Sequence, residues 1–112
     1  MSSMSEEVTM KDFKRLDIRI GTVAKVEHIP GSDKLYRLQV DMGGEMRQIV
    51  TGLVGYYTAD ELKGKVLAIL TNLKPAKIFG QMSYGMLLAA EFEDKLALLT
   101  TDRGLPNGAR VT

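Results

Sequence analysis

The chain has 112 residues, of which 45% are hydrophobic and 26% charged, and its formal net charge is +1. This length predicts one domain with a modest core, and the composition is typical of a soluble globular protein. The lack of cysteine excludes a disulfide framework and a thiolate zinc site, and no apolar run approaches the roughly 18 residues that span a bilayer. We therefore expect a cytoplasmic protein that does not enter a membrane.

The first elements predicted are a short helix and a long strand. Residues 1–8 are polar and acidic, unlike a signal or transit peptide, and we expect them to be disordered, with the domain formed by 9–112. A capping-box spacing at Thr9 predicts a helix over 10–16. Period-two alternation then predicts a half-buried strand over 18–26, with a bulge or sharp bend at Gly21.

A β-hairpin follows the first strand. The sequence predicts strands at 35–42 and 45–51, joined by the pair Gly43-Gly44. Arg37 and Arg47 are candidates for the same outer face of this hairpin.

The second half of the chain predicts a short helix and further strands. Thr58 is the expected cap of a helix over 59–62. Strands are predicted at 65–70, 86–91, 95–100 and 109–111. This order matches an oligonucleotide/oligosaccharide-binding (OB) fold, a five-stranded Greek-key barrel. We therefore predict an all-β, five-stranded OB barrel with short helices, although order alone does not separate it from other small barrels.

The connection after the strand at 65–70 is the candidate functional segment. It carries Lys74 and Lys77, and its glycines Gly80 and Gly85 bracket four polar or amphipathic residues. No acid occurs over 62–90, so one face of a nearly neutral molecule is expected to be positive. Loops rooted in buried strands often carry function, but exposed lysines also serve solubility alone.

Several short motifs in this chain resemble a known family. The runs D-I-R-I-G, D-K-L-Y, V-T-G-L, N-L-K-P and S-Y-G-M occur in this order between about residues 12 and 111. They resemble the tRNA-binding domain shared by methionyl-tRNA synthetase C-terminal regions, EMAP-II-like cytokine precursors and free-standing structure-specific tRNA-binding proteins. The secretion chaperone CsaA is a more distant relative. With no catalytic domain attached, the chain is similar to the free-standing type, called a methionyl-tRNA synthetase beta subunit in archaea.

The resemblance implies an OB barrel, a homodimer built through the terminal segments, and tRNA binding by shape and backbone rather than by base sequence. It also implies a non-catalytic protein that acts in trans with methionyl-tRNA synthetase. The binding positions of the family correspond here to Lys34, Arg47, Asn72, Lys74, Lys77, Ser83 and Met86.

Most of these residues also have a structural interpretation. The four cations can neutralise phosphates or can be ordinary solvated side chains. Asn72 can read a sugar hydroxyl or base edge, or can hold the loop by bonding its own backbone. Ser83 can donate to a phosphate. Met86 can lie against a base or ribose, or can be the first core residue of the next strand.

The remaining residue types point away from catalysis and from unpaired RNA. His28 is the only histidine, so a metal site or a histidine-based triad is not expected, and we predict no cofactor and no enzyme activity. Aromatic residues are too few for a stacking platform, which favours a folded RNA as ligand.

An alternative partner is an unfolded polypeptide, bound as by CsaA through an adaptable apolar patch of Phe79, Met82, Tyr84 and Met86. A homodimer is also expected because four apolar residues near the ends of the chain need cover that a small barrel does not supply. These residues are Leu16, Leu105, Ala109 and Val111.

Overall fold

The computed structural model describes residues 6–112. The expected disordered segment, 1–8, therefore lies mostly outside the described residues, and 6–8 are exposed without regular secondary structure. No helix among the described residues is long and apolar enough to cross a membrane.

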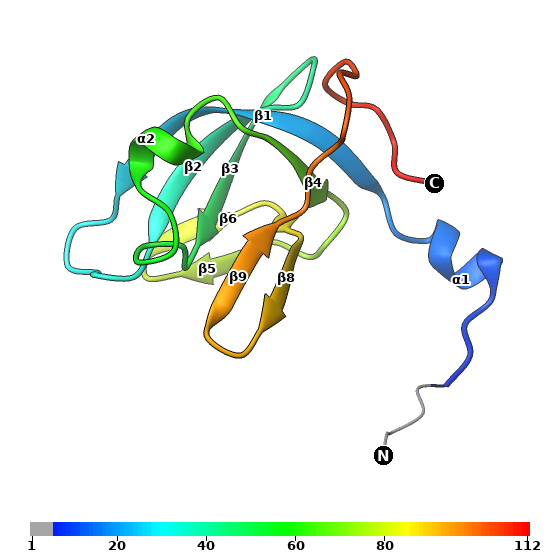
Figure 1. The fold of residues 1–112 in the computed structure, drawn as a ribbon, viewed down its shortest axis with the longest axis horizontal. Coiled ribbons are helices and arrows are strands. Elements are labelled where there is room, and N and C mark those ends of the chain that lie inside the picture. The colour runs from blue at the N-terminus through cyan, green and yellow to red at the C-terminus, as the bar shows by residue number, and fades with distance from the viewer. Residues whose placement is uncertain (1–5) are drawn as a thin grey trace.

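A five-stranded antiparallel sheet that curls into a half-barrel forms the body of the molecule (Figure 1). Its strand order is β3 (Met46–Thr51), β2 (Tyr36–Asp41), β1 (Ile18–His28), β4 (Val66–Leu70) and β7 (Met86–Leu87). The long β1 pairs with β4 through its first half and with β2 through its second half. The predicted all-β, five-stranded class is confirmed.

Two small hairpins extend from this sheet. One consists of β5 (Ala76–Ile78) and β6 (Gln81–Ser83), and the other of β8 (Ala89–Phe92) and β9 (Lys95–Leu98). The sequence predicted a single loop where β5 and β6 lie, because three-residue strands are too short to show a period. Phe79 and Gly80, which both have positive φ angles, form the turn between β5 and β6.

Both helices are short, and both begin with a capping box. The helix α1 (Met10–Lys14) is capped by Thr9, as predicted, but ends two residues before the expected 10–16. The helix α2 (Ala59–Leu62) has the predicted bounds, with Thr58 as its cap.

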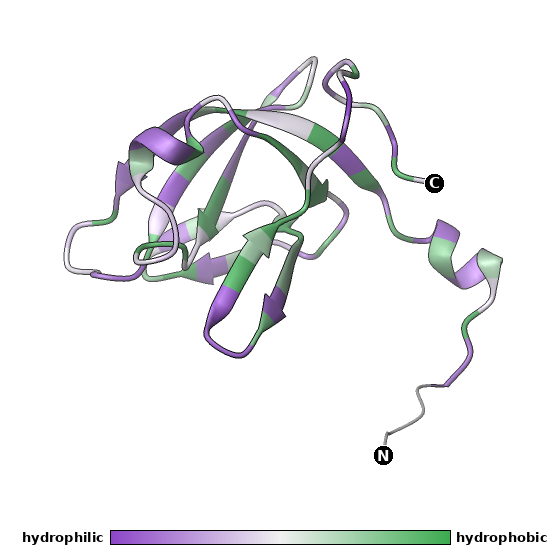
Figure 2. Ribbon diagram, viewed as in Figure 1, coloured by the Kyte–Doolittle hydropathy of each residue, from purple (hydrophilic) through white to green (hydrophobic). Residues whose placement is uncertain are grey.

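β4 is buried on both faces, which explains its uninterrupted apolar sequence (Figure 2). Leu67 and Ile69 belong to the main core inside the barrel. Ala68 and Leu70 belong to a second apolar cluster with Ile18 and Ile20 on the outer side. This outer cluster is covered in part by Phe13, Val66, Leu88, Ala109 and Val111.

Gly21 does not form the predicted bulge. The register of β1 against β2 shifts between Val23 and Lys25 instead. A Cβ atom at Gly21 would lie 2.6 Å from the Met42 sulfur and 2.8 Å from Val40 Cγ1. The glycine is therefore required by close packing between β1 and β2.

The expectation that Arg37 and Arg47 share an outer face is also wrong. Arg37 pairs with Val50, whereas Arg47 pairs with Val40. Paired residues share a face and successive residues alternate, so a regular register places the two arginines on opposite faces. The predicted final strand at 109–111 is reduced to an isolated bridge between Arg19 and Arg110.

Candidate nucleic-acid interface

Three of the predicted binding residues are exposed lysines on neighbouring connections. Lys34 lies between β1 and β2, Lys74 between β4 and β5, and Lys77 on β5. None of the ion pairs found within residues 6–112 involves these three lysines. Their charges are therefore free to attract an anionic partner.

The β1–β2 connection, which carries Lys34, meets the turn of the β5–β6 hairpin, whose first strand carries Lys77. Phe79, in the β5–β6 turn, lies against Gly31 in the β1–β2 connection, where an added Cβ would be 3.4 Å from its ring. The β1–β2 connection and the β5–β6 hairpin, each of which carries one of these lysines, therefore lie against each other.

A hollow of about 190 Å³ opens beside Lys74. It brings together three predicted site residues, since Ser83 and Met86 also line it. The other lining residues are Val50, Thr51, Leu73, Ala76, Ile78, Gly85 and Leu87. Lys77 lies between two lining residues on β5 and therefore projects from the opposite face of that strand.

Met86 lies at the rim of this hollow rather than in the core. Its side chain is 46% exposed, and the next residue, Leu87, is the one buried in the main core. The interpretation of Met86 as the first core residue is therefore wrong. With Leu73, which is also exposed, Met86 offers an apolar edge next to the Lys74 charge.

Ser83 is buried, with 4% of its surface exposed, and its hydroxyl is already hydrogen-bonded within the protein. The oxygen accepts from the backbone N–H of Val50 at 3.0 Å and the hydroxyl donates to the carbonyl of Gly85 at 3.1 Å. The hydroxyl thus joins β3 to the segment before β7 and shapes one wall of the hollow.

Asn72 joins the β4–β5 connection to the start of β1. Its Oδ1 accepts from the backbone N–H of Asp17 at 2.9 Å, and its Nδ2 donates to the carbonyl of Arg15 at 2.7 Å. The predicted structural role was a bond to its own backbone, and the observed partners are instead 55 and 57 residues away.

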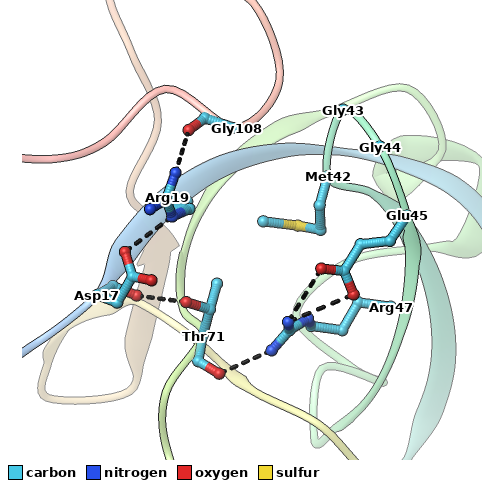
Figure 3. Close-up of a pocket in the computed structure, with 9 residues that line it drawn as sticks. All are labelled: Asp17, Arg19, Met42, Gly43, Gly44, Glu45, Arg47, Thr71 and Gly108. Carbon is cyan, nitrogen blue, oxygen red and sulfur yellow. Dashed lines mark hydrogen bonds and ion pairs between the residues drawn. The ribbon is translucent and has the colours of Figure 1, made fainter.

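Arg47 lines a second hollow, of about 540 Å³, which none of the three lysines lines (Figure 3). Its guanidinium donates to the carbonyls of Thr71 and Tyr84, and to the Glu45 carboxylate.

Arg19, across this hollow, is paired with Asp17 and bonded to the Gly108 carbonyl. Both arginines therefore carry a carboxylate partner, and the hollow has little net charge. Within residues 6–112 no cluster of three or more His, Asp or Glu residues could hold a metal ion.

Arg37 was not a predicted site residue, yet it connects the main sheet to the β5–β6 hairpin. It donates to the side-chain oxygen of Gln81 at 2.9 Å and to the Glu27 carboxylate at 3.0 Å. Hydrogen bonding to Arg37 lowers the pKa of Glu27. No sequence signal identified this link, because its members belong to three different strands.

Comparisons with known proteins agree over almost the whole chain. A family model described as a putative tRNA binding domain matches residues 18–110. A methionine–tRNA ligase of Archaeoglobus fulgidus is 50% identical over 106 residues, which are 95% of this chain and 16% of that protein. One of Thermotoga maritima is 46% identical over 112 residues, 100% of this chain and 18% of that protein. The chain thus spans less than a fifth of these relatives.

Two solved structures are also similar. A MetRS-related protein from Pyrococcus horikoshii has a TM-score of 0.90 and 40% identity, with 96% of this chain and 100% of that chain covered. The chaperone CsaA from Bacillus anthracis has a TM-score of 0.86 and 29% identity, with the same coverage. This chain therefore belongs to the family of putative tRNA-binding domains.

Proposed function

We propose that this protein is a non-catalytic, structure-specific tRNA-binding protein built on an OB-type barrel. The observation that carries the proposal is a set of three exposed lysines, Lys34, Lys74 and Lys77, that take part in no ion pair found within residues 6–112; one of them, Lys74, lines a hollow with an apolar rim. Lysines neutralise phosphates without reading sequence, whereas RNA shape sets where those phosphates lie.

The seven candidate residues divide into two roles. The three lysines meet phosphates, and Met86 lies against a ribose or base at the rim. Ser83, Asn72 and Arg47 act by holding the binding loops. Ser83 and Asn72 bond to the backbone of distant segments, and Arg47 donates through its terminal nitrogens while its buried Nε has no partner within residues 6–112. We count all seven as part of the tRNA site, but only four as direct contacts.

Action in trans with methionyl-tRNA synthetase, in the cytoplasm, is part of the same proposal. Two observations support it. The curated relatives are methionine–tRNA ligases of which this chain matches a small part. The MetRS-related protein of Pyrococcus horikoshii, by contrast, is covered over its full length.

The test is a binding titration at moderate salt with unmodified tRNA, a linear RNA of equal length and a DNA duplex. We expect tRNA to bind at least about tenfold more tightly than the other two, because only a folded RNA places phosphates around the hollow in three dimensions. Equal, weak binding of all three would reject the proposal.

A second candidate function is binding of unfolded polypeptides, favoured by the similarity to CsaA and by exposed apolar residues within the segment 73–86. These residues are Leu73, Phe79, Tyr84 and Met86, whereas Met82 of the predicted patch is only half-exposed. Binding of an unfolded protein that persists at high salt, with no competition from tRNA, would support this function over the first.

We propose further that the protein forms a homodimer. The helix α1 has no buried residue, and an apolar groove of about 390 Å³ lies between it and the C-terminal segment. The groove is lined by Met10, Phe13, Lys14, Leu16, Arg110, Val111 and Thr112. A second copy would cover this surface.

A further inference from the structure

The turn between β5 and β6 holds an aromatic residue in a backbone conformation that such residues rarely adopt. Ile78 pairs with Gln81, so Phe79 and Gly80 alone form the turn, and their φ angles are 51° and 80°. A two-residue hairpin turn with positive φ at both positions favours asparagine followed by glycine. A bulky side chain in this conformation is an outlier, and such outliers cluster at ligand-binding sites. Phe79 is therefore a candidate binding residue.

The side chain of Phe79 is exposed and does not serve the core. The residue is 57% exposed, and it belongs to neither of the apolar clusters found within residues 6–112. One edge of its ring lies near Gly31, where an added Cβ would be 3.4 Å from Cε2 and 3.6 Å from Cζ. The β1–β2 connection thus supports one edge of the ring. Core packing does not explain why an aromatic residue occupies the turn.

The turn is also held in place from the main sheet. Gln81, which directly follows the turn, accepts a hydrogen bond from Arg37 on β2 at 2.9 Å. Arg37 is itself paired with Glu27 on β1. A ligand that contacts Phe79 therefore meets a backbone that is already ordered, which lowers the entropy cost of binding.

The charges around the turn favour an anionic ligand. Lys77 lies two residues before Phe79, and Lys34 lies in the β1–β2 connection that supports the ring. Neither lysine takes part in an ion pair found within residues 6–112. Asp33 is the only acid in this connection and the β5–β6 hairpin has none, so two lysines and one acid leave a net charge of +1. A nucleotide matches this surface, because its base is flat and its phosphates are negative.

We propose that Phe79 is a stacking platform for one unpaired base of the bound RNA, with Lys34 and Lys77 next to the flanking phosphates. The inference rests on the proposed tRNA-binding function and adds a fifth direct contact to it. The loops and corners of a folded RNA expose bases that stack on aromatic side chains, whereas a duplex keeps its bases paired. Stacking tolerates any base, so the platform recognises an unpaired base without reading sequence.

The first test compares tRNA affinity and stability in Phe79→Asn and Phe79→Tyr. Asparagine suits the turn but removes the ring, whereas tyrosine keeps the ring. We expect Phe79→Asn to bind unmodified tRNA at least about fivefold more weakly, with a melting temperature no lower than that of the wild type. Phe79→Tyr should bind tRNA as the wild type does. Wild-type affinity in Phe79→Asn would overturn the proposal.

A second ligand separates stacking from general damage to the cationic surface. This ligand is a blunt RNA duplex with the same number of nucleotides as the tRNA and no unpaired base. We expect Phe79→Asn to bind the duplex as the wild type does, with an unchanged salt slope, because no phosphate contact is lost. An equal loss of affinity for tRNA and duplex would reject the platform.

The same titrations distinguish the failure of this inference from the failure of the proposed function. A wild-type protein that binds tRNA no more tightly than the duplex would reject the proposed function, and the platform with it. A wild-type preference for tRNA that Phe79→Asn fully retains would reject the platform alone.

A spectroscopic test uses the absence of tryptophan from the chain. Phe79→Trp introduces a single indole at the turn, and a base stacked on it should quench its fluorescence when tRNA is added. Phe92→Trp is the matched control, since Phe92 is 74% exposed but lies among acids on the β8–β9 hairpin. We expect quenching in Phe79→Trp only. Absence of quenching, or equal quenching in both variants, would contradict the proposal.

An unfolded polypeptide is the other ligand that suits an exposed aromatic residue. The wild type and Phe79→Asn are therefore also titrated with a permanently unfolded protein. We expect Phe79→Asn to lose affinity for tRNA and to keep any affinity for the polypeptide. The reverse result would assign Phe79 to polypeptide binding and reject the stacking platform.

Discussion

The hydroxyl oxygen of Ser83 accepts a hydrogen bond from the backbone N–H of Val50 at 3.0 Å, across 33 residues of sequence. This bond closes the gap between β3 and the segment that leads into β7. The adjacent side chain of Gln48 reinforces the closure by donating to the Met82 carbonyl at 2.8 Å. The wall of the hollow beside Lys74 is therefore held by these two side chains and by one backbone bond, from the N–H of Tyr84 to the Gln48 carbonyl at 2.9 Å, rather than by a regular strand ladder.

Ser83→Ala is expected to destabilise the fold by about 1–3 kcal/mol, because the buried N–H of Val50 loses its acceptor. Urea unfolding measures this loss. We expect tRNA affinity to fall only if the loss of this bond deforms the wall of the hollow. Unchanged stability together with a large loss of tRNA affinity would instead show that the hydroxyl contacts RNA directly.

Replacing the lysines one at a time tests their contacts with phosphate. Each of Lys34→Ala, Lys74→Ala and Lys77→Ala should reduce the slope of log K against log salt by about 0.7–0.9, the value for one phosphate contact. Lys63→Ala is the matched control, since Lys63 is an exposed lysine at the end of α2. Titration of tRNA at four salt concentrations gives the slopes, and equal slopes for all four variants would contradict the assignment.

Gly85→Ala is expected to cost about 1–3 kcal/mol, because the new methyl group overpacks a tight contact. It would lie 3.1 Å from the Leu70 carbonyl and 3.2 Å from Ile69 Cγ2. In Gly44→Ala the methyl group meets nothing within 4 Å, so this control should change stability by less than about 0.5 kcal/mol. Thermal unfolding of both variants compares them, and equal melting temperatures would show that the contact relaxes freely.

The Glu27–Arg37 pair predicts a dependence of stability on pH. The pKa of Glu27 is lowered from its ordinary value of 4.5 by hydrogen bonding to Arg37, so this contribution to stability is complete above that value and is lost as the pH falls through the lowered pKa. We expect Glu27→Gln to lower the melting temperature at pH 7 and to have little effect at the acidic end of a series from pH 7 to pH 2.5.

Glu61→Gln is the control for the Glu27 prediction. Hydrogen bonds from Thr58 lower the pKa of Glu61. Glutamine at this position also completes a capping box, so Glu61→Gln keeps the hydrogen bonds to Thr58. A difference between the wild type and Glu27→Gln that does not change with pH would contradict the prediction.

The sequence by itself determined the elements whose signals are local. Thr9 and Thr58 lie at capping-box spacing, and the alternation in β2 and the uninterrupted apolar run of β4 indicate how many faces each strand buries. These features depend on neighbours within a few residues, so they can be read from the chain alone. The motifs also identified the family, and the acid-free stretch over 62–90 contains Lys74 and Lys77.

Only the tertiary structure decided what the polar candidates bond to and which of them lie together. Asn72 and Ser83 bond to partners 55 and 33 residues away, and the register of β3 turns Arg47 to the opposite face from Arg37. Periodicity and spacing do not predict such pairings, because the pairings form only when the sheet curls and brings distant segments into contact. The exposure of Phe92 could not be predicted from the sequence either, because the burial of a residue depends on all the segments that pack around it.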